Sequence, residues 1–498
     1  MSGRSSPQDT AERALQAAGD DECIVIADEQ SSANLRWAGN TLTTNGMSRS
    51  RRLTVIATSR SADGIRVGAV SRAAVRDDQV ASVVAEAQQA AAQSLPAPDA
   101  RPLLRPADLR AAATHAAQAA RGAGSGPGQP PAAGAGPGSG RLVTDGWDAP
   151  PGATDIGVFG RFAGELGAVF AVAAAGGRRL YGFAEHTVTS SFLATSTGLR
   201  LRHDQPTGTV ELNAKSADLS ESAWTGAATR DFAEVDVAAL EADLAQRLGW
   251  AARRVELPAG RYETLLPPSA VADLMTYLYW SAGARDALDG RTVFSRPGGA
   301  TRIGEQLASL PVTLRSDPWE PGLECVPFAA AHASSRRSSV FDDGLPLHRT
   351  EWISSGTLAA LTQTRHSAQL TGLPVTPMID NLIMEAPGHG GSLPELVRRT
   401  GRALLLTSLY YIREVDPQTL LLTGLTRDGV YLVENGEVVG AVNNFRFNES
   451  PVALLGRLAE AGSTQATLPR EFGEAFPRAA MPPLRVEGFN MSSVSQAT

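Results

Sequence analysis

The first hundred residues alternate between amphipathic and extended patterns. Residues 9–19 have helical spacing of apolar positions and end at Gly19, which favours a helix end. Residues 23–29 form an apolar run typical of a strand. Residues 33–46 alternate and end at Asn45-Gly46, which predicts a hairpin turn. The next expected elements are two strands and a long helix, at residues 51–59, 64–71 and 76–93.

A stretch of Gly, Pro, Ala and Ser at residues 121–141 separates this N-terminal α+β domain, residues 1–110, from the rest of the chain. Such a composition buries too little apolar surface to offset its ordering entropy. Residues 111–145 are therefore expected to be a flexible linker or insertion. The next segment, residues 146–250, is a middle α/β segment. Its pattern indicates strands within residues 168–175, 180–203 and 207–217 and a helix at residues 236–252.

Short apolar runs broken by Gly, Pro and Asn begin near Arg254 and predict a β-rich C-terminal domain, residues 251–498. One exception is the stretch LMTYLYW, Leu274–Trp280, which has the pattern of a buried central helix with Ser269 as its N-cap. Asn435-Gly436 between two β-rich runs predicts a hairpin. The expected fold class is α+β: N-terminal α/β modules followed by a largely β domain that contains a central buried helix.

Composition narrows the classes of partner and compartment. Hydrophobic residues are 43% and charged residues 19%, typical of a soluble globular protein. The net charge of −7 argues against nucleic acid or an anionic membrane as partners. We expect neither a secretory signal nor an apolar run near the roughly 20 residues that span a bilayer. Two distant cysteines give no disulfide framework. These features predict a cytoplasmic protein.

The titratable residues form no recognisable catalytic motif. None of the histidines is followed by Glu, and none has helical ligand spacing to another. A zinc site assembled from distant residues remains an alternative. Cys325 precedes His332 by seven residues, but a buried structural thiol is the favoured interpretation, and no GxSxG elbow occurs. The seven histidines are His115, His186, His203, His332, His348, His366 and His389.

Three short polar stretches favour simple structural roles. The loop around His389 lacks the GK[ST] ending of a phosphate-binding loop and is expected to be a flexible turn. The cluster Ser48–Arg52 has no interleaved aromatic residues and indicates a solvated strand end. Asp342 and Asp343 precede Gly344, a pattern typical of a turn.

The stretch VNNFRFNES, residues 442–450, is the most suggestive polar segment. Its amides and guanidinium crowd the end of an apolar strand, where they could pair with an extended peptide. The alternative is that they tie a strand end to neighbouring loops by local hydrogen bonds. The candidates for a substrate cleft or an interface are Asn443, Asn444, Arg446 and Asn448.

Several segments resemble the TldD/PmbA family. Residues 411–451 resemble the family's C-terminal domain, residues 33–55 its N-terminal strands and residues 195–203 its middle segment. The resemblance implies a two-subunit bacterial metallopeptidase. A TldD-type subunit carries zinc on an HExxxH helix, and a TldE/PmbA-type subunit of the same fold lacks those groups. Together they enclose a chamber that admits unfolded or extended peptides.

The resemblance also indicates which subunit this chain is. In TldD-type chains a Gly and a VFS strand follow the metal helix, and here GRTVFS begins at Gly290. Counting back without gaps lays the HExxxH window on residues 275–280. Met275 and Trp280 then occupy the ligand positions, and Thr276 occupies the Glu position. The chain therefore resembles the TldE/PmbA type, with no catalytic or metal-binding residues of its own.

The leading hypothesis is a non-catalytic subunit that binds no cofactor itself and forms a heterodimer with a zinc-bearing TldD-type subunit. Its substrates would be unfolded or extended peptides, for peptide maturation or degradation. One alternative is a stand-alone peptide-binding or scaffold protein. A less favoured one is an independent hydrolase that uses Cys325 or scattered histidines.

Overall fold

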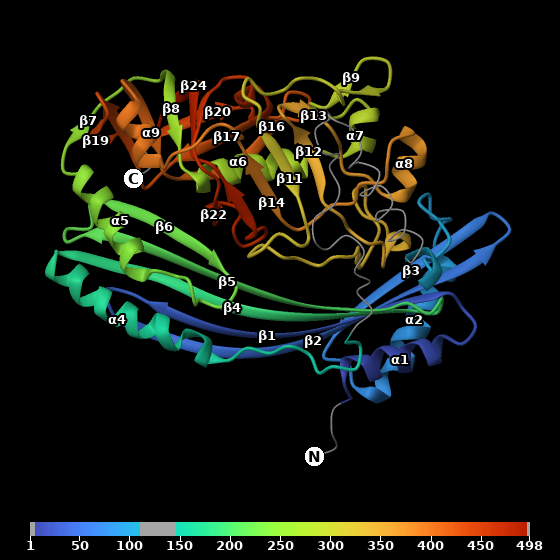
Figure 1. The fold of residues 1–498 in the computed structure, drawn as a ribbon. Coiled ribbons are helices and arrows are strands. Elements are labelled where there is room, and N and C mark those ends of the chain that lie inside the picture. Colours follow the sequence, from blue (N-terminus) through green and yellow to red (C-terminus); the bar gives the residue numbers. More distant parts are fainter. Residues whose placement is uncertain (1–4, 110–145, 496–498) are drawn as a thin grey trace, which may run out of the picture.

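The computed structural model describes residues 5–109 and 146–495. The expected linker, residues 111–145, lies outside the described residues. Figure 1 shows a long, gently curved sheet built from the first half of the chain, with the C-terminal residues stacked along one side of it. The fold class is α+β as predicted: an N-terminal α/β part is followed by a β-rich part with a buried helix.

The long sheet is antiparallel and has six strands in the order β3-β2-β1-β4-β5-β6. Residues 1–110 and 146–250 each contribute three strands, so these two segments share one sheet. The first three are β1 (Cys23–Trp37), β2 (Leu42–Ser61) and β3 (Gly64–Ala73). The second three are β4 (Arg178–Thr195), β5 (Arg200–Ser216) and β6 (Ser222–Thr229).

Helices cover the face of this sheet that points away from the C-terminal part (Figure 1). At one end the apolar cluster includes Val25, Val55 and Val84; at the other it includes Trp37 and Phe162. The first helix ends at Gly19, as the sequence predicts, but it begins two residues before the predicted start, after a Ser6 capping box. The helices are α1 (Pro7–Ala18), α2 (Val80–Gln93), α4 (Gly160–Ala175) and α5 (Val237–Trp250).

The predicted hairpin turn at Asn45-Gly46 is wrong. The turn lies at residues 38–41, where Gly39 and Asn40 have φ angles of 58° and 65°. Strand β1 has to continue to Trp37, because that side chain packs on Phe162 in the apolar cluster. Asn45 and Gly46 consequently lie inside β2. An Asn-Gly pair tolerates a tight turn but does not require one.

The predicted strand at residues 168–175 is also wrong, because these residues belong to α4. Its buried residues recur three and four positions apart, the spacing of a helix rather than a strand. With the short 3-10 helix η2 (Ile156–Phe159), residues Ile156–Ala175 are long and apolar enough to cross a membrane by length and composition alone. This corrects the expectation of no such run. About a third of its apolar window is buried inside the protein.

The C-terminal part has two large sheets with helix α6 (Pro268–Trp280) between them. Ser269 is not the N-cap: Pro267 is, and Pro268 occupies the first helical position that proline favours. The hairpin at Asn435-Gly436 is confirmed, with φ angles of 51° and 84°.

The strands of a ten-stranded mixed sheet follow the order β16-β17-β20-β24-β8-β15-β18-β19-β7, and β21 pairs with β24 beside this row. Its strands are β7 (Arg254–Val255), β8 (Gly260–Leu266), β15 (Arg402–Leu406), β16 (Leu409–Asp416), β17 (Leu421–Thr426), β18 (Val430–Glu434), β19 (Glu437–Val442), β20 (Phe445–Glu449), β21 (Leu458–Ala461) and β24 (Leu484–Val494).

A six-stranded sheet runs in the order β13-β12-β11-β14-β23-β22. Its strands are β11 (Thr313–Ser316), β12 (Thr350–Ser354), β13 (Thr357–Leu358), β14 (Leu382–Glu385), β22 (Gln465–Thr467) and β23 (Ala479–Met481). A small hairpin and the short helices complete this part: β9 (Ser295–Arg296), β10 (Ala300–Thr301), α7 (Ala284–Leu288), α8 (Arg365–Thr371), α9 (Leu393–Arg399) and α10 (Pro451–Leu455).

Candidate functional site

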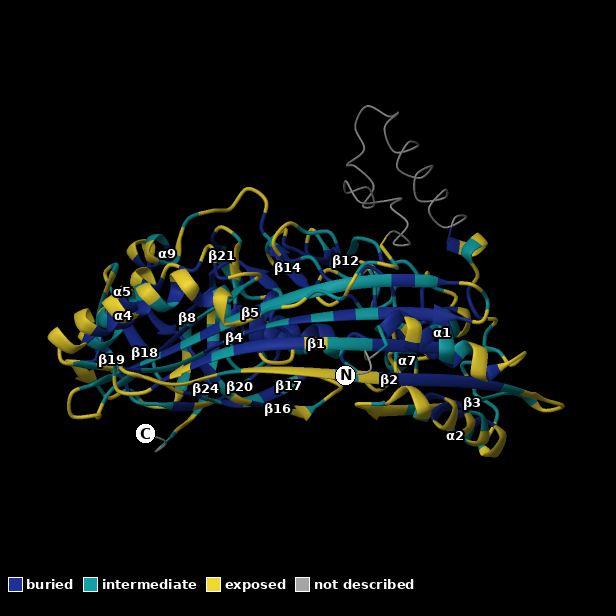
Figure 2. Cartoon of the chain, turned by 90° about the horizontal axis from the view of Figure 1, so that it is seen from below, coloured by how far each residue is buried: buried dark blue, intermediate teal, exposed yellow. Residues whose placement is uncertain are grey.

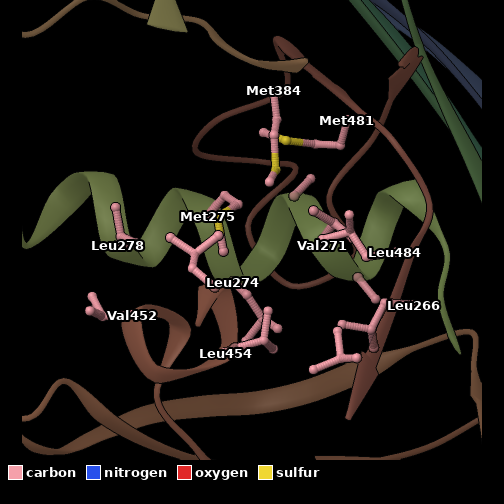
Figure 3. Packing of buried hydrophobic residues seen from close by; sticks show 14 of the residues in the cluster. Leu266, Val271, Leu274, Met275, Leu278, Met384, Val452, Leu454, Met481 and Leu484 are labelled. Atoms are coloured by element: carbon pink, nitrogen blue, oxygen red, sulfur yellow. The ribbon is translucent and has the colours of Figure 1, made fainter. Parts of the chain in front are cut away.

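Helix α6, which holds the expected HExxxH-equivalent window, is buried on nearly all sides. Met275 and Thr276 have no exposed surface. Figure 3 shows the helix between Met384 and Met481 on one side and Val452 and Leu454 on the other. Trp280, at the last position of the window, is half-buried. Its ring packs on Phe472 and Phe476, with ring centroids 5.0 and 6.2 Å apart.

One carboxylate does lie on α6, but its oxygens are fully engaged. Asp273 is buried and accepts backbone N–H bonds from Arg470, Glu471 and Phe472 at 3.2, 2.9 and 3.2 Å. Burial raises the pKa of Asp273 to about 8, and the three donors act in the opposite direction. This side chain therefore holds the segment 470–472 against the helix.

The residues of the window do not fit a zinc ion. A hydrolytic zinc site needs imidazole, thiolate or carboxylate ligands with an open position for water. The window offers the thioether of Met275, the hydroxyl of Thr276 and the indole of Trp280. Within residues 5–109 and 146–495, no group of three or more His, Cys, Asp or Glu side chains could hold a metal ion.

Cys325 and His332 have separate surroundings. Cys325 is buried beside Leu347 and Ile379, and burial raises the pKa of its thiol to about 12. His332 instead bonds to Thr54 through Nδ1 at 2.9 Å and lies 3.5 Å from Asp28 through Nε2. A thiol with so high a pKa is neutral at pH 7 and is a poor nucleophile.

The 442–450 stretch lies where β19 ends and β20 begins, and much of its bonding is local. The Asn443 Oδ1 accepts the Leu257 backbone N–H at 2.8 Å, while its Nδ2 is buried without a partner among the described residues. The Asn444 Oδ1 accepts from the Thr426 hydroxyl at 3.3 Å, and the Asn444 carbonyl accepts from the Ser495 N–H at 2.8 Å.

The later residues of this stretch point to different surroundings. Arg446 is exposed and donates to the Thr423 hydroxyl at 3.3 Å. The Asn448 carbonyl accepts from the Asn490 side chain at 3.0 Å, and the Asn448 Oδ1 is buried with no partner within the described ranges. The structure therefore brings Asn443 and Asn444 to one place and leaves Arg446 and Asn448 farther along β20.

Asn443 and Asn444 line a pocket of about 230 Å³ between the β5–β6 turn and the C-terminal sheet. Its wall also carries two guanidinium groups and three carboxylates, and two of these charges form an ion pair between Arg254 and Glu221. Such a pocket can accept and donate hydrogen bonds at several points along a polar ligand. The charged lining residues are Glu221, Arg254, Glu256, Arg427 and Asp428.

A second pocket, of about 290 Å³, lies on the polar face of the long sheet. It is lined by Asp28, His332 and Arg52 together with hydroxyl and amide side chains. Asp28 also accepts a hydrogen bond from Ser191 at 2.6 Å. Sequence reasoning missed this pocket, because its residues come from three strands and a distant loop, and no local motif marks them.

Comparison with known proteins places the C-terminal part in a family. Residues 259–493 match the family described as the PmbA/TldA metallopeptidase C-terminal domain. This match covers just under half of the chain. The matched region begins just before β8 and ends within β24, so it contains α6 and the 442–450 stretch. No curated protein matches the chain.

Solved structures share the fold of this protein over nearly its whole length. TldE from Thermococcus kodakarensis aligns with a TM-score of 0.73 at 15% identity, covering 97% of this chain and 99% of the other. A candidate modulator of DNA gyrase from Thermotoga maritima aligns with a TM-score of 0.71 at 14% identity, with the same coverage. One from Bacteroides thetaiotaomicron gives 0.69 at 13% identity, covering 98% and 99%. At these identities the likeness concerns the fold.

Proposed function

We propose that this chain is the non-catalytic, TldE/PmbA-like subunit of a heteromeric TldD/TldE-type zinc metallopeptidase. The zinc and the hydrolytic groups belong to a TldD-type partner in a heterodimer, and the substrates are unfolded or extended peptides in the cytoplasm. The observation that carries the proposal is the window on α6, where Met275, Thr276 and Trp280 stand at the ligand and base positions.

The burial of this window supports the proposal. Met275 packs inside an apolar core, and a thioether there cannot replace an imidazole that must present its nitrogen to a metal. Asp273 cannot serve as the base either, since three backbone N–H groups already occupy its oxygens. The helix therefore contributes stability rather than hydrolytic chemistry.

The pocket at Asn443 and Asn444 is the part of this chain that we assign to peptide binding. An extended peptide offers one N–H and one C=O per residue, and primary amides match both groups. The Asn443 Nδ2 is buried and has no partner among the described residues, so it can donate to a peptide carbonyl once the side chain turns into the pocket. The charged lining has both signs, which suits termini or side chains of either charge.

The test is to purify this chain alone and together with a TldD-type partner, and to measure zinc content and peptide cleavage. The complex should cleave and contain one zinc per partner chain, while this chain alone should do neither. A Glu→Ala change in the HExxxH motif of the partner should abolish cleavage. Stoichiometric zinc or robust cleavage by this chain alone would overturn the proposal.

A pair of variants tests the polar stretch. Asn443→Ala should weaken substrate turnover by the complex and leave assembly intact, and Arg446→Ala should do the same if its exposed guanidinium meets substrate. Arg402→Ala is the matched control, because Arg402 is an exposed arginine on the same sheet that pairs with Glu434 away from the pocket. Loss of assembly with Asn443→Ala would assign this residue to the interface.

Two alternatives give different results in the same assays. A stand-alone binding or scaffold protein would retain peptide without any cleavage, even with the candidate partner present. An independent thiol hydrolase would cleave alone and lose activity on Cys325→Ser. The raised pKa of the Cys325 thiol argues against that hydrolase.

A further inference from the structure

Strand β2 has an outer segment that forms hydrogen bonds on one side only. Residues 42 and 44–50 pair with β1, with a β-bulge at Thr43, whereas β3 begins to pair with β2 at Arg52. In the part of the chain that the structure describes, no strand pairs with the other side of residues 42–50, which we call the free edge. Figure 2 shows this part of β2 as an exposed ribbon along the rim of the sheet.

The free edge has few of the features that usually protect sheet edges: one charged residue, Arg49, and one β-bulge, at Thr43. It contains no proline, and its nine residues extend over about 30 Å. Two of its apolar side chains are exposed, Leu42 at 46% and Met47 at 63%. Only Gly46 among these residues is partly buried. From Thr44 to Ser50 the edge is regular, and an unpaired edge of this kind is a template for pairing with another strand.

The direction of its backbone groups follows from the neighbouring ladder. The Ala74 N–H donates to the Arg51 carbonyl at 2.9 Å, so the odd-numbered residues here point away from β1. Because the direction alternates along a strand, Asn45, Met47 and Arg49 present both N–H and C=O outward. These groups have no partner in the ladders that the structure forms.

We propose that two copies of this chain associate by antiparallel pairing of their free edges, which joins two six-stranded sheets into one. When residues 42–50 of both copies overlap fully, Gly46 lies on the two-fold axis and faces Gly46 of the second copy. Gly46 sits at a position that does not exchange hydrogen bonds, where antiparallel Cα atoms approach most closely, about 4.5 Å. Glycine leaves that approach free of side chains.

The sequence of the free edge is complementary to itself in this register. Asn45 and Met47 face each other across the pair, where their outward N–H and C=O groups exchange hydrogen bonds. Arg49 lies opposite the β-bulge at Thr43, whose hydroxyl donates to the Arg36 carbonyl at 3.1 Å, so no arginine opposes another. Arg51 is neutralised within its own chain by an ion pair with Glu29. A closed two-fold contact of this kind favours a second copy over an unrelated strand.

This association is independent of the proposed peptidase role, and its test measures mass rather than activity. The purified chain should have twice its 52.1 kDa mass in light scattering after size exclusion at micromolar concentration. Asn45→Pro should give the monomer mass, because proline removes an outward N–H while the bonds to β1 stay intact. Asn45→Thr is the matched control and should remain dimeric, with circular dichroism verifying the fold of both variants.

A crosslinking experiment tests the register. Gly46→Cys should form an intermolecular disulfide with a copper oxidant in most of the protein, since each new thiol meets its own copy at the axis. Leu42→Cys and Ser50→Cys are controls that should crosslink at least tenfold less, because each faces a different residue. The native Cys23 and Cys325 are buried and should not react.

Three outcomes would overturn the proposal. One is a wild-type chain that stays at 52.1 kDa at micromolar concentration. Another is a dimer that Asn45→Pro leaves unchanged. The third is crosslinking at residue 42 or 50 that equals crosslinking at residue 46. A chain that is monomeric alone and uses this edge only for a same-fold partner or an extended peptide falls under the first outcome.

Discussion

Helices α4 and α6 are both apolar, yet the protein uses them in opposite ways. Helix α6 is enclosed between two sheets, and large side chains leave it in every direction. Helix α4 lies on the outside of the long sheet, and only Phe162, Leu166 and its neighbours on one face are buried. Its outward face consists mainly of glycine and alanine. The difference shows that the size of the side chains around a helix, more than its mean hydropathy, tells whether it is enclosed.

The contrast between α4 and α6 would fail most clearly if a large side chain of α6 could be removed with little loss in the free energy of unfolding. Met275→Ala should lower the free energy of unfolding by about 2–5 kcal/mol, because it leaves a cavity in a close-packed core. Urea unfolding followed by circular dichroism measures this change. A loss under about 0.5 kcal/mol would mean that α6 is not enclosed on all sides.

A smaller loss in the free energy of unfolding is expected at Asp273, the buried carboxyl on α6. Asp273→Asn should cost about 1–3 kcal/mol at pH 5, since an amide cannot accept all three N–H bonds from residues 470–472. The same unfolding measurement applies. The matched control Asp416→Asn changes a turn carboxylate at the end of β16, which is not fully buried, and should cost well under about 1 kcal/mol.

The pH dependence of that cost has a definite sign. Burial raises the pKa of Asp273 to about 8 from the ordinary 3.8, so between these values the native state holds a proton that the unfolded state has lost. The contribution of this group to stability is therefore fully present below about pH 4 and declines as pH rises to about 8. The stability advantage of wild type over Asp273→Asn should shrink between about pH 5 and 8.5. A constant difference would contradict the raised pKa.

Thr276 offers a test in the opposite direction. Its hydroxyl oxygen is buried on α6 without a hydrogen-bond partner in the described ranges, which leaves its desolvation uncompensated. Thr276→Val keeps the shape of the side chain and should raise the free energy of unfolding by up to about 1 kcal/mol. A destabilised Val variant would indicate that the hydroxyl has a partner, such as an ordered water.

The smallest effect is expected on the outward face of α4. Val172 is 56% exposed, so Val172→Ser should change the free energy of unfolding by no more than about 0.5 kcal/mol. Thermal and urea unfolding should both agree with wild type. A loss near that of Met275→Ala would mean that this face is covered in solution, and would remove the contrast between the two helices.

The sequence predicts the parts of the fold in which local pattern and tertiary packing agree. Asn435-Gly436 forms the expected turn because the runs on both sides can pair, and α6 forms because its apolar residues are large and continuous. Asn45-Gly46 fails as a turn because the packing of Trp37 extends β1 past the point where local rules would end it. Residues 168–175 fail because a short apolar run does not distinguish a strand from a helix.

The candidate site was predictable only where it is continuous in sequence. Asn443 and Asn444 could be selected because polar residues are unusual at the end of an apolar strand. Arg254 and Arg427 line the same pocket but lie far apart along the chain, and each looks like an ordinary surface charge. Only the pairing of β7 with β19 brings Arg254 beside this strand end.

The central strands of the ten-stranded sheet have a consequence for synthesis of the protein. Strand β8 is the first long strand of the C-terminal part, and it pairs with β24, about 220 residues later: Leu266 faces Leu484, and Gly260 faces Met491. One of the two hydrogen-bonding edges of β8 therefore has no partner strand until β24 leaves the ribosome. At roughly 5–20 residues per second, this delay lasts more than about ten seconds. The nascent C-terminal part must stay soluble over that time with one edge of β8 unpaired, and a chain stopped before β24 cannot complete the sheet.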